Sequence, residues 1–255
     1  MSDPGTQQLQ AQPRALFDTE LFERRIREYA ASHSGTIRIL EAGCGRRWNL
    51  DITGVSFHVT GIDLNADAIR MRLAELGDLN AAIIGDLRAT SLPPRFYDVV
   101  FSSFVLEHIA GAEQVLDRLI PAIRPGGLML LRIPDRDSVY GFVTRHAPYW
   151  LRVQYKRRIK GAKQAGTAGR GPFPPVYDRV VSWRGMTAYC REHGLEILDA
   201  YSSNFYLDSL GRLAGLADRG LRSIARCSRG RLAADHNNIA LVIRAPGDSR
   251  LSPPR

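Results

Sequence analysis

A β-rich apolar run that ends in a glycine-rich turn constrains this chain more than any other stretch. Residues 37–42 read Ile-Arg-Ile-Leu-Glu-Ala and lead directly into Gly43-Cys-Gly45. Glycine has no Cβ, so the backbone at Gly43 and Gly45 can turn tightly and a ligand can lie directly against it. The run therefore predicts a strand that delivers Glu41 and a close-contact turn to one edge of a sheet.

Two further apolar runs end in an acid. Residues 61–63 end in Asp63, and residues 83–86 end in Asp86. Parallel strands bring their carboxyl ends to one edge of a sheet, so the three runs together predict a nucleoside pocket at that edge.

Strand-like runs alternate with helical patterns along most of the chain. This alternation predicts an α/β fold with a doubly wound, mostly parallel, seven-stranded sheet. The expected strands cover residues 36–42, 55–62, 81–84, 98–101, 128–133, 195–201 and 238–243.

Helix starts are indicated by polar side chains that can cap them. Thr19, Asn65 and Ser182 each precede apolar residues at helical spacing. Gly77 fits the end of the helix that Asn65 begins. The apolar stripe of that helix is expected to consist of Ile69, Leu73 and Leu76.

The order of these motifs resembles that of class I S-adenosylmethionine-dependent methyltransferases. The matching elements are Glu41-x-Gly43-x-Gly45, Asp63, Asp86, residues 97–102 and residues 124–128. Residues 104–108, Phe-Val-Leu-Glu-His, are similar to the type 11 subgroup, which includes ubiquinone and menaquinone biosynthesis methyltransferases. The resemblance covers about residues 35–135 and implies a Rossmann-like sheet, S-adenosylmethionine as cofactor and S-adenosylhomocysteine as product.

The resemblance also implies roles for individual residues. Glu41 would face the ammonium group of the cofactor, Asp63 the ribose hydroxyls and Asp86 the adenine amino group. Each acid could instead be a loop acid, a helix cap or a solvent-facing turn residue. The expected cofactor-binding set is Glu41, Gly43, Gly45, Asp63, Leu64, Asp86, Leu87 and Ser102.

The glycine pattern departs from the family at one position. The family often has a third glycine where this chain has Arg47. Arg46 and Arg47 either reach the cofactor carboxylate or face water. A nicotinamide-dependent dehydrogenase is a further interpretation of a glycine-rich turn after a strand. Its third glycine would fall at Trp48, which weakens this interpretation.

His108 is the candidate catalytic residue. Histidine titrates near neutral pH, so it can accept the proton of a hydroxyl acceptor. The alternative is a histidine at a helix start that bonds to the backbone. No metal is expected, because Phe104 stands where some RNA 2′-O-methyltransferases have the first glutamate of a metal-binding run. The candidates on the substrate side are His146, Tyr149, Tyr177 and Tyr206.

The domain prediction is a single methyltransferase domain over residues 14–245, with disordered ends at 1–13 and 246–255. Lid insertions are expected at about 135–180 and 207–231. The segment from Arg145 to Arg179 mixes aromatic and basic residues, and it is expected to be a lid over the acceptor site. A solvated insertion is the alternative.

Composition limits the partners and the compartment. The net charge is +9, which favours anionic partners such as nucleic acid, acidic lipid or phosphorylated substrates, although arginine also covers ordinary solvated faces. Residues 1–12 are polar, and no run approaches the ~20 apolar residues of a membrane span. Three scattered cysteines form no disulfide framework, so a cytoplasmic protein is expected, with peripheral membrane contact as an option.

The expected function is methyl transfer to a small metabolite, a glycan or a lipid-linked acceptor, most simply as O-methylation. An RNA methyltransferase is the first alternative, since the basic and aromatic segment could stack on bases and neutralise phosphates. A non-catalytic module that binds S-adenosylmethionine or another nucleoside is the second. The sequence does not indicate the acceptor or the oligomeric state.

Overall fold

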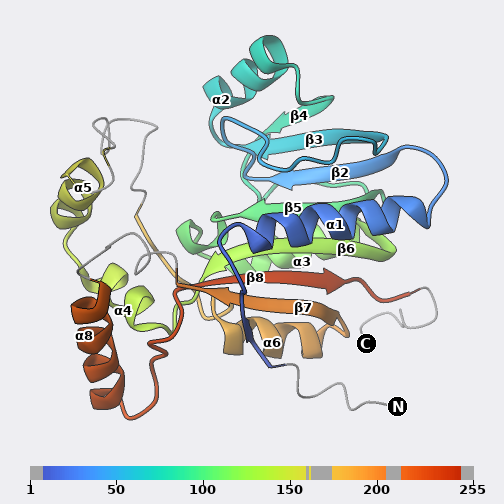
Figure 1. Cartoon of the computed structure of the whole chain (residues 1–255). Helices are drawn as coiled ribbons and strands as arrows, with labels where there is room; N and C mark the ends of the chain where they lie inside the picture. Colours follow the sequence, from blue (N-terminus) through green and yellow to red (C-terminus); the bar gives the residue numbers. More distant parts are fainter. Residues whose placement is uncertain (1–7, 159–160, 162–173, 205–213, 248–255) are drawn as a thin grey trace, which may run out of the picture.

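The computed structural model describes residues 8–158, 161, 174–204 and 214–247 (Figure 1). Its centre is an eight-stranded sheet in the order β1-β7-β8-β6-β5-β2-β3-β4. Neighbouring strands are parallel except β8, which runs antiparallel to both β6 and β7. The strands are β1 Gln10–Ala11, β2 Ile37–Ala42, β3 Phe57–Asp63, β4 Ala81–Ile84, β5 Tyr97–Ser103, β6 Ile123–Pro134, β7 Glu196–Ser203 and β8 Asn238–Arg244. The predicted α/β, mostly parallel fold is confirmed.

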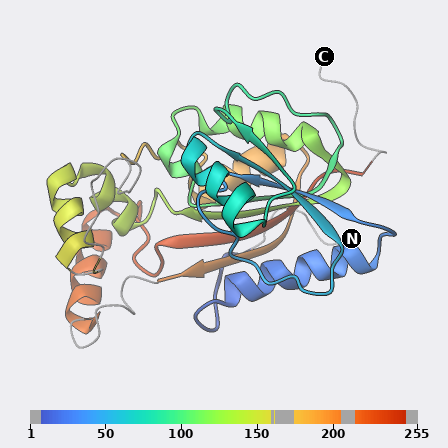
Figure 2. The same ribbon diagram turned by 90° about the horizontal axis from the view of Figure 1, so that it is seen from above.

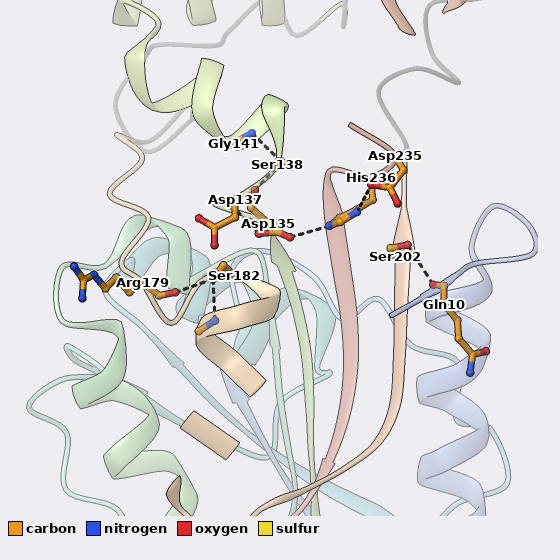
Figure 3. Close-up of polar contacts among 11 residues, drawn as sticks. Gln10, Asp135, Asp137, Ser138, Gly141, Arg179, Ser182, Ser202, Asp235 and His236 are labelled. Carbon is orange, nitrogen blue, oxygen red and sulfur yellow. Dashed lines mark hydrogen bonds and ion pairs between the residues drawn. The ribbon is translucent and has the colours of Figure 1, made fainter. Parts of the chain in front are cut away.

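The eighth strand, β1, lies in the segment for which disorder was predicted. Gln10 pairs with Tyr201 of β7, and the backbone amide of Gln12 donates to the carbonyl of Ser202 at 2.8 Å. The Ser202 hydroxyl donates to the carbonyl of Gln10 at 3.2 Å (Figure 3). A polar strand of two residues has no periodicity that a sequence pattern could detect, and only its partner strand reveals it.

Helices cover both faces of the sheet. Figure 2 shows α1 on one side and α3 with α6 on the other. Leu116 and Met186 belong to one buried apolar cluster, whereas Phe22 and Ile69 belong to the second, on the α1 side. The helices are α1 Phe17–Ala31, α2 Ala66–Met71, α3 Ala112–Ala122, α4 Val139–His146, α5 Tyr149–Arg158, α6 Trp183–Glu192 and α8 Ala214–Cys227, with a π-helical turn at Arg72–Leu76 and a 3-10 turn at Leu106–His108.

Two of the three predicted helix caps are confirmed. Asn65 accepts hydrogen bonds from two backbone amides of α2, and Ser182 accepts one from the amide of Gly185. Thr19 does not cap α1, because that helix already begins at Phe17. The Thr19 hydroxyl instead accepts a hydrogen bond from Arg132 of β6 at 2.7 Å, which ties α1 to the sheet.

The predicted apolar stripe after Asn65 is wrong beyond its first residue. Ile69 is buried, but Leu73 and Leu76 are 44% and 52% exposed. The helix widens into the π-helical turn at residues 72–76, which rotates the following side chains relative to α-helical spacing. Arg72 therefore points into the protein, and it is fully buried. Gly77 ends the turn in the left-handed conformation, as predicted.

Helices α4, α5 and α8 form a side lobe, defined here as residues 139–158 and 214–233. Figure 1 shows it beyond the carboxyl ends of the parallel strands. Residues 159–160, 162–173 and 205–213 of the two predicted lid insertions lie outside the described residues, so the lid role stays a prediction. Among the described residues, no helix is long and apolar enough to cross a membrane.

A buried polar cluster joins the side lobe to the sheet. Asp135 follows β6 directly, and its carboxylate contacts Nε2 of His236, just before β8, at 2.8 Å (Figure 3). Nδ1 of His236 contacts Asp235 at 3.0 Å. Nearby, the amide of Ala233 donates to the carbonyl of Asp137, which links the chain after α8 to the chain before α4.

The His236 cluster predicts a pH-dependent loss of stability in a variant. Burial lowers the pKa of His236, but its hydrogen bonds and charge interactions with Asp135 and Asp235 outweigh this effect and raise the pKa. A raised folded-state pKa stabilises the protein fully below the unfolded pKa of about 6.5, and the stabilisation fades as pH rises through the folded value. His236→Gln should cost about 2–3 kcal/mol at pH 6 and clearly less at pH 9, measured by urea unfolding.

The matched control is His58→Gln, because His58 is exposed on β3. Its cost should be small and the same at both pH values. An equal cost of His236→Gln at pH 6 and pH 9 would contradict a charged role for His236.

Candidate active site

A pocket of about 280 Å³ lies at the carboxyl ends of β2 and β5. Three of the predicted cofactor residues line it, namely Glu41, Gly43 and Gly45. Arg46 and Arg47 also line it, so two exposed arginines lie at this pocket. The remaining lining residues are Cys44, Asn49, Phe101, Ser103 and Phe104.

The turn after β2 requires glycine for two different reasons. Gly43 has φ +76°, and a Cβ there would lie 2.3 Å from Cγ2 of Val105. Gly45 has φ +54°, but a Cβ there would meet no atom within 4 Å. Val105 directly precedes the 3-10 turn that carries His108. The absent side chain of Gly43 therefore lets this turn approach the strand.

Glu41 is paired with a residue that the sequence analysis did not select. The Arg72 guanidinium lies 2.6 Å from the Glu41 carboxylate, 2.9 Å from that of Asp78 and 2.7 Å from the carbonyl oxygen of Cys44. Burial raises the pKa of Glu41 to about 7, and Arg72 opposes that rise. Arg72 thus keeps a buried acid partly ionised at neutral pH and anchors the glycine turn.

Asp63 is held by the same turn. One carboxylate oxygen accepts the amide of Gly45 at 2.8 Å, and the other accepts the amide of Asn65 at 2.8 Å. Each oxygen keeps a second lone pair that could accept a further donor. The carboxylate is therefore oriented at the end of β3, beside the pocket that Gly45 lines.

Asp86 follows β4, the next strand of the sheet. It forms an ion pair with Arg88 at 2.5 Å, and its carboxylate also accepts the Arg88 amide at 2.8 Å. The hydrogen bonds from Arg88 lower the pKa of Asp86 to about 2. A ligand amino group would therefore compete with Arg88 for this carboxylate, which the sequence pattern did not indicate.

Three predicted cofactor residues differ widely in exposure. Leu64 is 72% exposed beside Asp63, whereas the Leu87 side chain is buried. Ser102 is buried too, and its hydroxyl has no hydrogen-bond partner within the described part of the chain. Strand alternation explains this placement, because Phe101 and Ser103 line the pocket and Ser102 points to the opposite face of β5.

His108 lies in the 3-10 turn after β5, partly exposed. Its Nδ1 lies 3.2 Å from the carbonyl oxygen of Pro174. A donated hydrogen bond there would leave Nε2 as the basic nitrogen, 3.7 Å from a carboxyl oxygen of Glu107. Burial raises the pKa of Glu107 to about 8, so this acid is mostly neutral at pH 7. The backbone carbonyl of Glu107 accepts the amides of Val176 and Tyr177.

The substrate-side candidates are not gathered in this pocket. His146 is exposed at the end of α4 and contacts the carbonyl of Phe142 at 2.7 Å. Tyr177 is buried and lies near His108 through the strap from Pro174 to Tyr177. Tyr206 and the side chain of Tyr149 lie outside the described part of the structure, so their roles stay predictions.

Gly43 and Gly45 should respond differently to a methyl group. Gly43→Ala combines left-handed strain with a clash, and should destabilise the protein by about 3 kcal/mol. Gly45→Ala adds only backbone strain, about 1 kcal/mol. Chemical denaturation of both variants measures the difference.

The clash can be tested separately from the strain. Adding Val105→Ala to Gly43→Ala should recover part of the lost stability, whereas adding it to Gly45→Ala should recover none. Equal costs for the two glycine variants would show that Val105 does not pack against the turn as described.

Comparisons with known proteins show which family this chain belongs to. The family model of the methyltransferase domain matches residues 13–200 of this chain. A protein of Mycolicibacterium smegmatis named as a probable S-adenosylmethionine-dependent methyltransferase is 31% identical over 99 residues, 38% of each chain. A ubiquinone biosynthesis O-methyltransferase of Chelativorans is 26% identical over 144 residues, 50% of this chain and 56% of that protein. The chain thus spans about two-fifths to just over half of these relatives.

Among solved structures, the [4+2]-cyclase SpnF has a TM-score of 0.52 and 14% identity, over 96% of this chain and 89% of that one. Similarity at this level shows a shared fold alone. The matched region covers most of the described chain and includes the glycine turn, the acids at the ends of β3 and β4 and the turn at His108. The chain therefore belongs to the methyltransferase domain family.

Proposed function

We propose that this protein is an S-adenosylmethionine-dependent methyltransferase that methylates a hydroxyl group. The observation that carries the proposal is the placement of Glu41, Asp63 and Asp86 at the carboxyl ends of three adjacent parallel strands, with Asp63 bonded to the Gly43–Gly45 turn. Membership of the methyltransferase family supports the reaction type. The fold alone would not, because one fold hosts many chemistries.

The residues of the site fit the parts of S-adenosylmethionine. Glu41 would bind the ammonium group, and Arg46 or Arg47 the carboxylate, since all three residues line the pocket. Asp63, oriented by two backbone amides, would accept the ribose hydroxyls. Asp86 and the backbone amide of Leu87 would bind the adenine edge. Leu64, exposed beside Asp63, offers an apolar surface to the adenosine.

When bound, the cofactor supplies an electrophilic methyl group on a sulfonium. The protein's part is to align the acceptor oxygen and to take its proton. His108 is the proposed base: the acceptor proton would move to Nε2 while Nδ1 donates to Pro174. Burial raises the pKa of Glu107 to about 8, so the acid 3.7 Å from Nε2 is mostly neutral at pH 7.

The proposed acceptor is a small metabolite, a glycan or a lipid-linked molecule. The Chelativorans relative, a ubiquinone biosynthesis O-methyltransferase, supports a hydroxyl acceptor and the type 11 subgroup. Tyr177 and His146 are proposed to lie toward the acceptor. RNA methylation and a non-catalytic binding role remain the competing outcomes of the tests below.

Cofactor binding should depend on pH through Glu41. Titration calorimetry should give heat with S-adenosylmethionine and S-adenosylhomocysteine, and the affinity should increase from pH 6 to pH 8. The sign follows because the pKa of Glu41 is about 7 and only its carboxylate attracts an ammonium group. Asp78 and Asp63 also face Glu41 and add to the rise of that pKa, while Arg72 opposes it.

Methylthioadenosine, which lacks the amino-acid part, provides the control ligand. Its affinity should vary little over this pH range, and Glu41→Gln should weaken S-adenosylhomocysteine about tenfold while leaving methylthioadenosine nearly unchanged. If none of the three ligands gives heat with folded protein at millimolar ligand, the proposed function is refuted.

Transfer of labelled methyl groups into a cell extract, separated into lipid, small-molecule and RNA pools, identifies the acceptor class.

The role of His108 is tested by the pH dependence of methyl transfer to that acceptor. His108→Asn should lower the rate 10²–10⁴-fold and remove the acid limb of the pH–rate profile, with unchanged S-adenosylhomocysteine affinity. His58→Asn, at an exposed position of β3, is the matched control and should retain the acid limb. A profile unaltered by His108→Asn would exclude His108 as the base.

A further inference from the structure

The side lobe carries a charge equal to that of the whole chain. Residues 139–158 and 214–233 contain ten of the 35 Lys and Arg residues but only one of the 26 acids, Asp218. Their net charge is +9, equal to the net charge of all 255 residues, so the rest of the chain is balanced overall. A single sign of charge concentrated on one lobe indicates an anionic partner.

Helix α8 exposes an apolar stripe on its outer side. Asp218, Leu221 and Ala225, at helical spacing, are the half-buried side of the helix, and α8 packs against α4. Leu216 and Ile224 lie on the other side, 69% and 41% exposed. The apolar side chains of Leu216 and Ile224 therefore lie outside the contact between α8 and α4.

Arginines flank this apolar stripe. Arg219, Arg222 and Arg226 recur at three and four residues along α8, and all three are exposed. Arg222 pairs with Asp218 at 2.7 Å. The apolar and basic stripes therefore run side by side along the same exposed half of the helix.

The other two helices of the side lobe add aromatic and aliphatic surface. Trp150 of α5 is 64% exposed, and Phe142 and Val143 of α4 are 40% and 45% exposed. Figures 1 and 2 both show α4, α5 and α8 together at one end of the molecule. Tryptophan combines an apolar body with a polar edge, which suits the boundary between water and lipid.

We propose that the outer surface of the side lobe docks on an anionic lipid bilayer. Leu216, Ile224 and Trp150 enter the boundary between head groups and acyl chains, and the flanking arginines reach the phosphates. Nucleic acid explains the surface less well, because Val143, Leu216 and Ile224 have no ring on which a base could stack.

The proposed docking surface does not depend on methyl transfer. Its position beyond the carboxyl ends of the strands does, however, place the bilayer on the same side of the sheet as the pocket at Glu41 (Figure 1). An acceptor held in the bilayer would then lie on the same side of the sheet as the candidate active site.

Sedimentation with vesicles tests the charge. The full chain should bind vesicles of equal parts phosphatidylcholine and phosphatidylglycerol, and should not bind phosphatidylcholine alone. Each basic residue near an anionic surface strengthens binding about fivefold. The triple variant R219Q/R226Q/R231Q, which includes the exposed Arg231 of the side lobe just after α8, should therefore bind about a hundredfold more weakly. The control R24Q/R118Q/R191Q removes three exposed arginines from α1, α3 and α6 and should bind as the parent does.

The apolar contribution has its own variant and its own signal. L216S/I224S should lose most vesicle binding although its charge is unchanged. The emission of Trp150 should shift to the blue with anionic vesicles, and Trp150→Phe should abolish that shift. Equal losses in the two triple variants, or unchanged binding in L216S/I224S, would overturn the proposal. Tight binding of a single-stranded RNA that R219Q/R226Q/R231Q abolishes, without vesicle binding, would overturn it in favour of nucleic acid.

Discussion

A fully buried guanidinium holds the candidate active site together. Arg72 contacts two carboxylates and the carbonyl of Cys44, so a single side chain joins β2, the glycine turn and the segment after α2. Removing a charge from water is costly, and here two acids and a carbonyl offset the cost. One nitrogen of the group still has no partner within the described chain. The geometry of Glu41 therefore depends on a residue that lies outside the glycine motif.

The sequence revealed the sheet far better than the contacts that orient its functional residues. Short continuous apolar runs predict seven strands because the central strands are buried on both faces of the sheet. Asn65 and Ser182 mark helix starts through a local hydrogen bond. Arg72 was missed because its burial depends on a π-helical turn, which shifts the inward face by a fraction of a turn. No residue type signals that shift.

The pairing of charged residues was equally hidden. Asp86 was expected to bind a ligand. Its carboxylate forms an ion pair with Arg88, two residues further along the chain, and no sequence pattern indicates this pair. Likewise, Ser102 belongs to a motif, but strand alternation turns Ser103 toward the pocket. Motifs identify which strand end carries a site. Which side chain of that end faces the ligand depends on register, and register depends on partners far away in the chain.

The position of β8 has a consequence for how the chain can fold. β8 lies between β6 and β7, so β7 can join the sheet only after residues 238–244 have been synthesised. Among the described strands β1 has β7 as its single neighbour, and it must wait for the same event although it is made first. The strands β2 to β6 can assemble earlier, because each finds its neighbours within that block. During translation the edge of β6 therefore stays open until β8 arrives, and in that interval it could pair with the strand of another chain.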